Sequence, residues 1–152
     1  MDSFDLGILA CLEEDGRQSF AAIADQVSLS KTPCWTRVQI LEASGVIKGY
    51  RAVIDPHALG LRLIAFVQVK IEFGRHAEFE QAVRDHPAII ECFTIAGEED
   101  YLLQVLTGDV EHLDRLLRED LCRLPGVQRF STTICLKRIK DNGQITRAAA
   151  GR

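Results

Sequence analysis

The chain has 152 residues, of which 47% are hydrophobic, and its 18 Lys and Arg residues against 22 Asp and Glu residues give a formal net charge of −4. This composition is that of an ordinary globular protein, long enough for one core or for two small domains. A weakly acidic chain does not coat nucleic acid as a polycation, so any DNA binding has to come from a local basic patch.

Several classes of protein are disfavoured by what the sequence lacks. It has no run of about 18 consecutive apolar residues, and acids stand at its N-terminus where a signal peptide has basic residues, so we expect a cytoplasmic protein. The five cysteines are widely spaced without a C-x-x-C pair, which argues against a disulfide scaffold and a zinc site. The four histidines are scattered and no nucleophile motif or glycine-rich phosphate loop occurs. We therefore expect no enzyme, no metal and no cofactor.

The first third of the chain predicts three short helices. Apolar residues recur at helical spacing over residues 5–14, 20–27 and 31–44. The second of these helices is only about two turns long, and a short turn joins it to the third. In the third helix the buried side carries Cys34 and Val38, so Cys34 is expected to act as a small core residue.

The pattern changes after the third helix. Residues 46–54 are rich in β-forming side chains, and Asp55 and Pro56 then interrupt the chain. This predicts a wing or connecting strand and a domain boundary near residues 55–60, with a first domain over residues 1–55.

The remainder of the chain alternates strands and helices. Strands are predicted over 61–73, 89–96, 101–107 and 127–140, and helices over 76–86 and 110–121. The order β-α-β-β-α-β is that of the ferredoxin-like split arrangement, so the predicted fold class is α+β with a second domain over residues 61–140. Residues 141–152 have no apolar period and are predicted to form a flexible tail.

The two helices at 20–27 and 31–44 have the spacing of a helix-turn-helix, whose second helix lies in the major groove of DNA. Residues 31–51 hold four basic side chains and one acidic side chain, so positive charge gathers where DNA would bind. Similar helix pairs also occur in unrelated proteins, and Trp35 could equally pack against a neighbouring helix. The candidate DNA contacts are Lys31, Thr32, Pro33, Trp35, Thr36, Arg37, Gln39, Lys48 and Arg51.

A second candidate site is the hairpin joint that follows Ala96. Three acids crowd there, at Glu98, Glu99 and Asp100, and could hold a cation or an amino group, while Tyr101 could frame a small ligand. A solvated hairpin fits the local sequence as well.

The motifs in both halves resemble those of the Lrp/AsnC, or feast/famine, transcriptional regulators, and the resemblance covers the chain apart from its tail. The N-terminal half carries Asp5-x-x-Ile8-Leu9-x-x-Leu12-x-x-Asp15-Gly16-Arg17, then Leu29-Ser30-x-Thr32-Pro33-Cys34-x-x-Arg37-Val38-x-x-Leu41-Glu42-x-x-Gly45-Val46-Ile47-x-Gly49-Tyr50, and then Asp55-Pro56. The C-terminal half carries Gly97-x-x-Asp100-Tyr101-Leu102-Leu103 and Leu124-Pro125-Gly126-Val127.

The resemblance implies an N-terminal winged helix-turn-helix that binds DNA. It also implies a C-terminal ferredoxin-like (RAM/ACT-like) domain that dimerises, assembles into octamers and often senses a small amino acid. It transfers an effector-binding role to Gly97, Asp100 and Tyr101: Asp100 would accept from the ligand amine, Gly97 would allow close backbone approach, and Tyr101 would help to shape the pocket. Many members have Gly-Asp-aromatic-Asp-Tyr here, and Glu98-Glu99 departs from that pattern, so no ligand preference transfers.

The sequence-based interpretation is a DNA-binding regulator, a homo-oligomer without catalytic activity. One alternative is an amino-acid-binding regulatory subunit of an enzyme, against which the helix-turn-helix with its basic patch argues. The other is an architectural protein that wraps DNA. The acidic net charge makes such nonspecific coating less favourable, because it depends mainly on neutralising phosphates.

Overall fold

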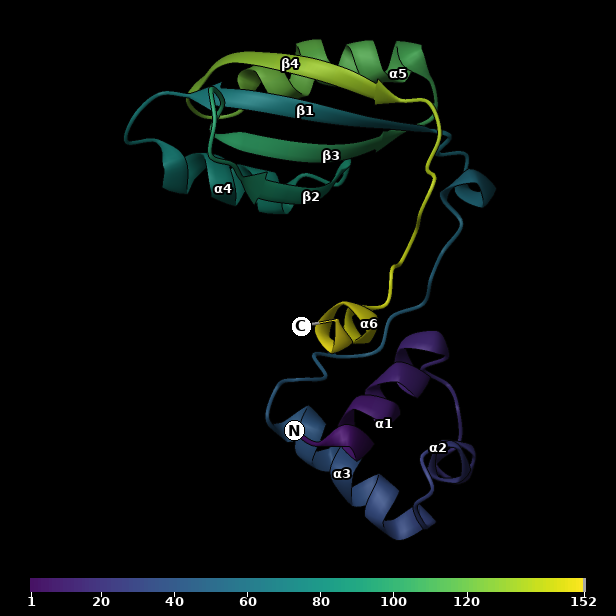
Figure 1. Ribbon diagram of the computed structural model, residues 1–152. Helices are drawn as coiled ribbons and strands as arrows, with labels where there is room; N and C mark the ends of the chain where they lie inside the picture. Colours follow the sequence, from purple (N-terminus) through teal and green to yellow (C-terminus); the bar gives the residue numbers. More distant parts are fainter. Residues whose placement is uncertain (152) are drawn as a thin grey trace. The chain divides into compact units, whose positions relative to one another are not determined.

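The computed structural model describes residues 1–151, which form two compact units (Figure 1). The first unit contains residues 1–53 together with the chain from Lys140 onward, and the second contains Ile54–Ile139. The division after Val53 lies near the boundary that the sequence predicts at residues 55–60. None of the helices in residues 1–151 has both the length and the apolar character that crossing a membrane requires.

The three helices predicted for the first unit are confirmed. They are α1 (Ser3–Glu14), α2 (Phe20–Gln26) and α3 (Lys31–Ala43). Helix α1 begins with a reciprocal capping box, in which the Asp2 carboxylate accepts the backbone N–H of Asp5 and the Asp5 carboxylate accepts that of Asp2. This arrangement satisfies backbone groups that a helix otherwise leaves open at its start.

One small core holds these helices together. The turn between α2 and α3 includes Ser28 in a left-handed backbone conformation, with φ of 57°. Cys34 is fully buried, as the helical pattern predicts. Because the core takes one face of α3, the opposite face is left at the surface. The buried core residues are Ile8, Cys11, Ile23, Ala24, Cys34, Val38 and Leu41.

The predicted strand over residues 46–54 does not form. The segment follows a left-handed turn at Gly45, and the backbone N–H of Ile47 donates to the carbonyl of Leu41 at 3.0 Å. A strand needs a neighbour with free backbone N–H and C=O groups, and the described part of the first unit is otherwise helical. The β-forming side chains of 46–54 therefore lie on a segment that forms no strand pairing within residues 1–151.

The second unit has the predicted β-α-β-β-α-β order. Its sheet is antiparallel with strand order β2-β3-β1-β4, as expected for a ferredoxin-like fold. A 3₁₀ turn at Pro56–Leu59 precedes the sheet. After α5 the helical path continues as a π turn at Leu116–Asp120 and a 3₁₀ turn at Leu121–Arg123. The elements are β1 (Leu63–Ile71), α4 (His76–Asp85), β2 (Ile89–Thr94), β3 (Tyr101–Thr107), α5 (Val110–Arg115) and β4 (Val127–Cys135).

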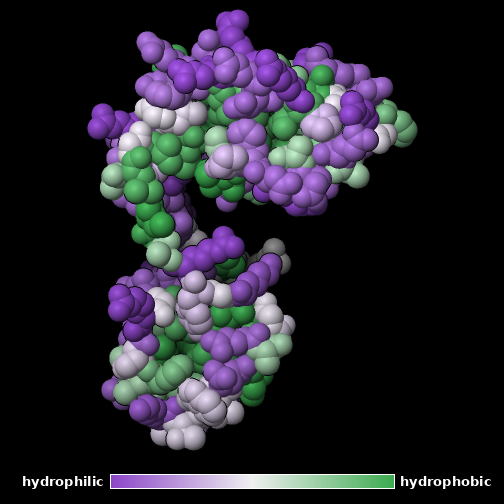
Figure 2. Space-filling model, turned by 180° about the vertical axis from the view of Figure 1, so that it is seen from behind, coloured by the Kyte–Doolittle hydropathy of each residue, from purple (hydrophilic) through white to green (hydrophobic). Residues whose placement is uncertain are grey.

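The first and last strands in sequence, β1 and β4, are shorter than predicted. Cys135 pairs with Ile64, close to the start of β1, and beyond this pair β4 has no partner strand. The chain continues in extended form, with Leu136 and Ile139 left 97% and 83% exposed. Hydrophobic surface is visible along the extended chain at the left of Figure 2.

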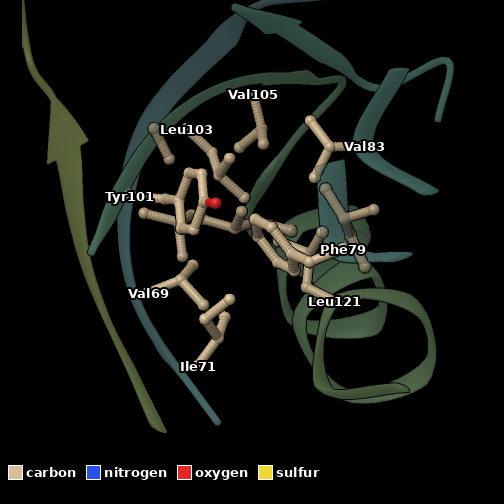
Figure 3. Packing of buried hydrophobic residues seen from close by; sticks show 12 residues of the cluster. Val69, Ile71, Phe79, Val83, Tyr101, Leu103, Val105 and Leu121 are labelled. Atoms are coloured by element: carbon tan, nitrogen blue, oxygen red, sulfur yellow. The ribbon is translucent and has the colours of Figure 1, made fainter. Parts of the chain in front are cut away.

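One face of the sheet carries the larger core. Alternate residues of β1 and β3 pack against α4 and the helical segment that follows β3, as Figure 3 shows for Tyr101, Phe79 and Leu121. The rings of Tyr101 and Phe79 lie 4.6 Å apart between centroids. The other residues of β1 and β3, such as Gln68 and Leu102, alternate with these core residues and point to the opposite face of the sheet. No described helix of the second unit packs on that face, which we call the helix-free face.

The chain after residue 140 differs from the predicted tail. It contains a short helix, α6 (Ile145–Ala150), which belongs to the first unit. The Glu13 carboxylate of α1 accepts the backbone N–H groups of Ile145 at 2.8 Å and Thr146 at 3.0 Å, as well as the Thr146 hydroxyl. A contact so distant in sequence has no local pattern, and the sequence therefore does not reveal it. Arg152, the last residue of the predicted tail, lies outside the described residues.

Candidate nucleic-acid interface and ligand cavity

The outward face of α3 presents a mixed set of polar, basic and aromatic side chains. Trp35 is 48% exposed and is not part of the core, and Ile40, further along α3, is 61% exposed. Such a face can donate to base edges, accept from them and contact a thymine methyl group. The predicted DNA contacts that are exposed on α3 are Lys31, Thr32, Pro33, Trp35, Thr36 and Gln39, and Lys48 and Arg51 are exposed after it.

Arg37 has a different environment from the other predicted contacts. Its guanidinium lies 2.6 Å from the Asp5 carboxylate and 2.9 Å from that of Asp2, and 5.4 Å from the ring centroid of Phe4. The hydrogen bond to Asp5 raises the pKa of Arg37 most, and the hydrogen bond to Asp2 raises it further. The side chain thus joins the start of α1 to the middle of α3, a role that sequence spacing does not reveal.

Glu42 connects α3 to the segment that follows it. Its carboxylate accepts from the Gln39 amide at 3.0 Å and from the Tyr50 hydroxyl at 2.9 Å. Burial, together with the hydrogen bond to Glu42, raises the pKa of Tyr50 to about 12, so this hydroxyl keeps its proton. The contact holds the segment containing Lys48 beside the end of α3, where both can face one duplex.

The joint between β2 and β3 is fastened to β1 by Asp100. One carboxylate oxygen accepts from the Lys70 ammonium and the other from the backbone N–H of Ile71, both at 3.0 Å. The hydrogen bond from Ile71 and then that from Lys70 hold the pKa of Asp100 below its usual value. Its own backbone N–H donates to Val69 at 3.0 Å. Both carboxylate oxygens of Asp100 are therefore used within the chain.

Tyr101 follows this joint directly, and its side chain belongs to the core on the face of the sheet that α4 covers. Its side chain is 2% exposed and points into the core between the sheet and α4 (Figure 3). The hydroxyl donates to Glu80 at 3.0 Å and lies 3.0 Å from His76 Nδ1. Burial and then the Glu80 contact raise the pKa of Tyr101 to about 12. These contacts fix Tyr101, and with it the residue at which the joint enters β3.

A cavity of about 600 Å³ lies between this joint and β4. Of the three predicted effector contacts, Gly97 lines it, whereas Asp100 and Tyr101 do not. The residues from β1 and β4 belong to the helix-free face of the sheet, apart from Phe130, whose position in β4 is opposite Val69. The lining residues are Gln68, Ile95, Ala96, Gly97, Glu98, Glu99, Arg129, Phe130 and Ser131.

An ion pair crosses this cavity. The Arg129 guanidinium lies 3.1 Å from Glu99 Oε1, while Glu99 Oε2 is buried without a hydrogen-bond partner. The Ser131 hydroxyl donates to the Gln68 amide oxygen at 3.4 Å. This contact does not use the amide N–H groups of Gln68. The sequence analysis missed these β1 and β4 residues. The strand alternation places Gln68 on the polar side of β1, but only the register of β1 against β4 brings Arg129 near the joint.

Comparison with known proteins gives consistent matches in both units. Residues 1–48 match a family of winged helix-turn-helix DNA-binding domains, and residues 64–145 match the Lrp/AsnC ligand binding domain. The chain is 44% identical over 146 residues to the proline dehydrogenase transcriptional activator of Rhizobium radiobacter, with 94% of each chain covered. It is 38% identical over 148 residues to the leucine-responsive regulatory protein of Escherichia coli, with 95% of this chain and 90% of that protein covered.

The solved structures show the same likeness. A transcriptional regulator of Neisseria meningitidis in complex with L-Met superimposes with a TM-score of 0.92 and 33% identity, covering 95% of this chain and 96% of that one. An AsnC family regulator of Agrobacterium tumefaciens superimposes with a TM-score of 0.87 and 30% identity, covering 93% and 94%. These relatives are regulators rather than enzymes.

Proposed function

Because the chain belongs to the Lrp/AsnC family of DNA-binding transcriptional regulators, we propose that it acts as a homo-oligomer that reads operator DNA with α3 and responds to an amino acid bound by its second unit. The observation that carries this proposal is the presence of both functions in one chain. A helix-turn-helix match covers residues 1–48, and a ligand-binding match covers residues 64–145. Since its target is DNA, its proposed place of action is the cytoplasm.

In the proposed complex the exposed face of α3 enters the major groove. The side chains of its first turns, including Lys31, Trp35 and Thr36, read base edges, and Lys48 and Arg51 contact phosphates from the following segment. Thr32, Pro33 and Gln39 complete the contact surface. Their exposure supports this assignment. Arg37 serves the same complex indirectly, because its contacts with Asp2 and Asp5 orient α3 on α1.

Two α3 helices have to face successive major grooves about 34 Å apart, which requires a dimer. The apolar part of the helix-free face of the sheet is the proposed dimer surface, because residues 1–151 do not cover its apolar side chains. Gln68, Arg129 and Ser131 lie on the same face but line the cavity, so we leave them outside this surface. Phe93 is 51% exposed there, and Phe66 and Leu102 are partly exposed. Larger assemblies, up to the octamer that the resemblance implies, would be built from such dimers.

The cavity beside Gly97 is the proposed effector site. Gly97 lets the backbone approach the ligand closely. The family resemblance implies that Asp100 binds the ligand ammonium, but both oxygens of that carboxylate already accept hydrogen bonds, so we assign Asp100 the role of fixing the joint. We assign Tyr101 a similar role, because its buried hydroxyl donates to Glu80 and fixes the end of the joint in the core. The neisserial relative with L-Met bound supports an amino acid as the class of effector.

Genome-wide mapping of bound sites, with and without each candidate amino acid, tests the proposed function. We expect discrete sites with two-fold symmetric half-sites, and occupancy that changes with at least one amino acid. The variant Trp35→Ala provides the comparison, because it alters the exposed face of α3 and leaves the core unchanged. Uniform coverage of the chromosome by both proteins would contradict sequence-specific regulation.

A further inference from the structure

The ion pair between Glu99 and Arg129 has unused capacity on both partners. The Glu99 side chain is 13% exposed, and only its Oε1 has a hydrogen-bonding partner. The Arg129 side chain is 62% exposed, and a guanidinium carries five N–H donors, of which the contact with Glu99 uses a small part. Both groups line the same cavity.

The unpartnered oxygen of Glu99 is costly where it lies. A buried carboxylate oxygen without a donor loses its hydration and gains no hydrogen bond in return. Oε2 does not reach solvent, so water does not repair this loss. A ligand that brings a cationic N–H donor, and opens residues 95–100 slightly to reach Oε2, would relieve it.

The separation of charges in the pair matches that in an α-amino acid. The carboxylate and guanidinium of the pair lie 3.1 Å apart, and the ammonium and carboxylate of an α-amino acid are separated by about the same distance, within hydrogen-bonding range of each other. A zwitterion laid antiparallel to the pair would place each of its charges beside the opposite one.

Resting on the proposed effector site, we propose that the Glu99–Arg129 pair is the element that recognises an α-amino acid, with Glu99 Oε2 accepting the ligand ammonium and Arg129 binding its carboxylate. The contact between Arg129 and Glu99 Oε1 stays in place while residues 95–100 open, so Arg129 remains beside Glu99 when the ligand binds. The amide N–H groups of Gln68 lie on the same wall as a further donor.

The charges around the pair also select the ligand side chain. Glu98 and Glu99 line the cavity against one cation, Arg129, so a bound zwitterion leaves the exposed Glu98 uncompensated. An acidic side chain would add a like charge beside Glu98, whereas an uncharged or basic one would not. The effector is therefore an amino acid whose side chain is not acidic, with Glu98 as the residue that rejects acidic ones.

Calorimetric titration of the full chain with the twenty protein amino acids tests this inference. Glutamine and glutamate have nearly the same shape, so their affinities isolate the effect of side-chain charge. We expect glutamate and aspartate to bind more weakly than their amides, by about threefold for unit charges roughly 7 Å apart in a largely aqueous setting. The Glu98→Gln variant should bring glutamate and glutamine closer together without weakening glutamine.

Substitution of the pair itself tests the recognition element. With the tightest ligand of the panel, Glu99→Gln and Arg129→Gln should each weaken binding about tenfold to hundredfold, the loss expected for one charge-assisted hydrogen bond. Glu111→Gln, an exposed change on α5 outside the cavity, should leave it unchanged. Circular dichroism at the titration temperature checks that each variant is folded, and Arg129→Lys provides a second, milder variant that keeps the charge.

The outcomes separate this inference from the proposed function. If an amino acid binds and Glu99→Gln binds it equally well, the recognition element is wrong while the effector site stands. If glutamate is among the tightest ligands, the role of Glu98 is wrong. If no amino acid binds at millimolar concentration, the proposed effector response fails and this inference fails with it.

Discussion

At the scale of single residues, we propose that Arg37 affects DNA binding by positioning α3 and does not itself contact DNA. Its two carboxylate partners tie α3 to the start of α1. We expect Arg37→Ala to lower both the thermal midpoint and the operator affinity, but to leave the slope of log affinity against log salt unchanged, since no phosphate contact is lost. Lys48→Ala, the matched change, should reduce that slope by about one.

These measurements distinguish the two roles of Arg37. If Arg37→Ala reduces the salt slope and leaves the thermal midpoint unchanged, then the guanidinium leaves Asp2 and Asp5 in the complex and contacts a phosphate. If affinity instead falls for one base position only, Arg37 reads that base directly.

Asp100 makes the stability of the joint between β2 and β3 depend on pH. Its pKa lies below the ordinary value of 3.8, because the ionised carboxylate accepts from Ile71 and Lys70. A lowered pKa in the folded state means that the contribution to stability is complete above 3.8 and is lost as the pH falls through the folded value. We expect Asp100→Asn to be less stable than the wild type at neutral pH. The difference in unfolding free energy should shrink as the pH falls below 3.8.

Urea denaturation at a series of pH values measures this difference. Asp85→Asn, an exposed change in the same unit, should remain close to the wild type throughout. A gap between wild type and Asp100→Asn that stays constant down to the acid limit would show that the charge of Asp100 does not hold the joint.

At the scale of secondary-structure elements, local pattern predicted most of the fold. The alternation of β1 and the helical spacing of α1, α2 and α3 are short-range signals of burial, and the structure confirms these elements. Residues 46–54 carry the composition of a strand, but a strand also needs a partner, which composition does not report. The π turn after α5 and the shortened β4 likewise depend on what the neighbouring segments offer.

The candidate sites divide in the same way. The exposed face of α3 follows from helical spacing, so most of its residues could be named from the sequence. The Arg37 contacts with Asp2 and Asp5 join different helices, and the Glu99–Arg129 pair joins a hairpin to the far edge strand. Such contacts depend on tertiary packing and register. Motif comparison found the joint itself, but not which of its acids faces the cavity.

Helix α6 provides a test at this scale. We expect deletion of residues 141–152, or Glu13→Gln, to destabilise the first unit by about 1 kcal/mol, the usual effect of losing a helix-capping contact. Trp35 is the one tryptophan of the sequence and lies in this unit, so its fluorescence during urea denaturation reports on the first unit. Glu14→Gln, beside Glu13 and exposed, is the control. Equal midpoints for wild type and deletion would show that α6 contributes nothing.

At the scale of the whole molecule, the proposed dimer surface can be separated from the DNA-reading surface. Leu102 lies partly exposed on the helix-free face of the sheet, where a partner would cover it. Leu102→Asp should shift the protein to monomers in sedimentation velocity and weaken binding to a two-half-site operator at least about tenfold, while binding to one half-site is retained. Val110→Asp, on the exposed side of α5, should do neither. A Leu102→Asp protein that remains dimeric would move the interface elsewhere.

The first unit is discontinuous in sequence, since its last piece follows the entire second unit. During translation, α1 to α3 emerge from the ribosome and can pack while the sheet is still being synthesised. Helix α6 and its contacts with Glu13 become available only after β4 has been made. A nascent chain can therefore assemble α1 to α3 early, but it forms the hydrogen bonds between Glu13 and α6 only near the end of its synthesis.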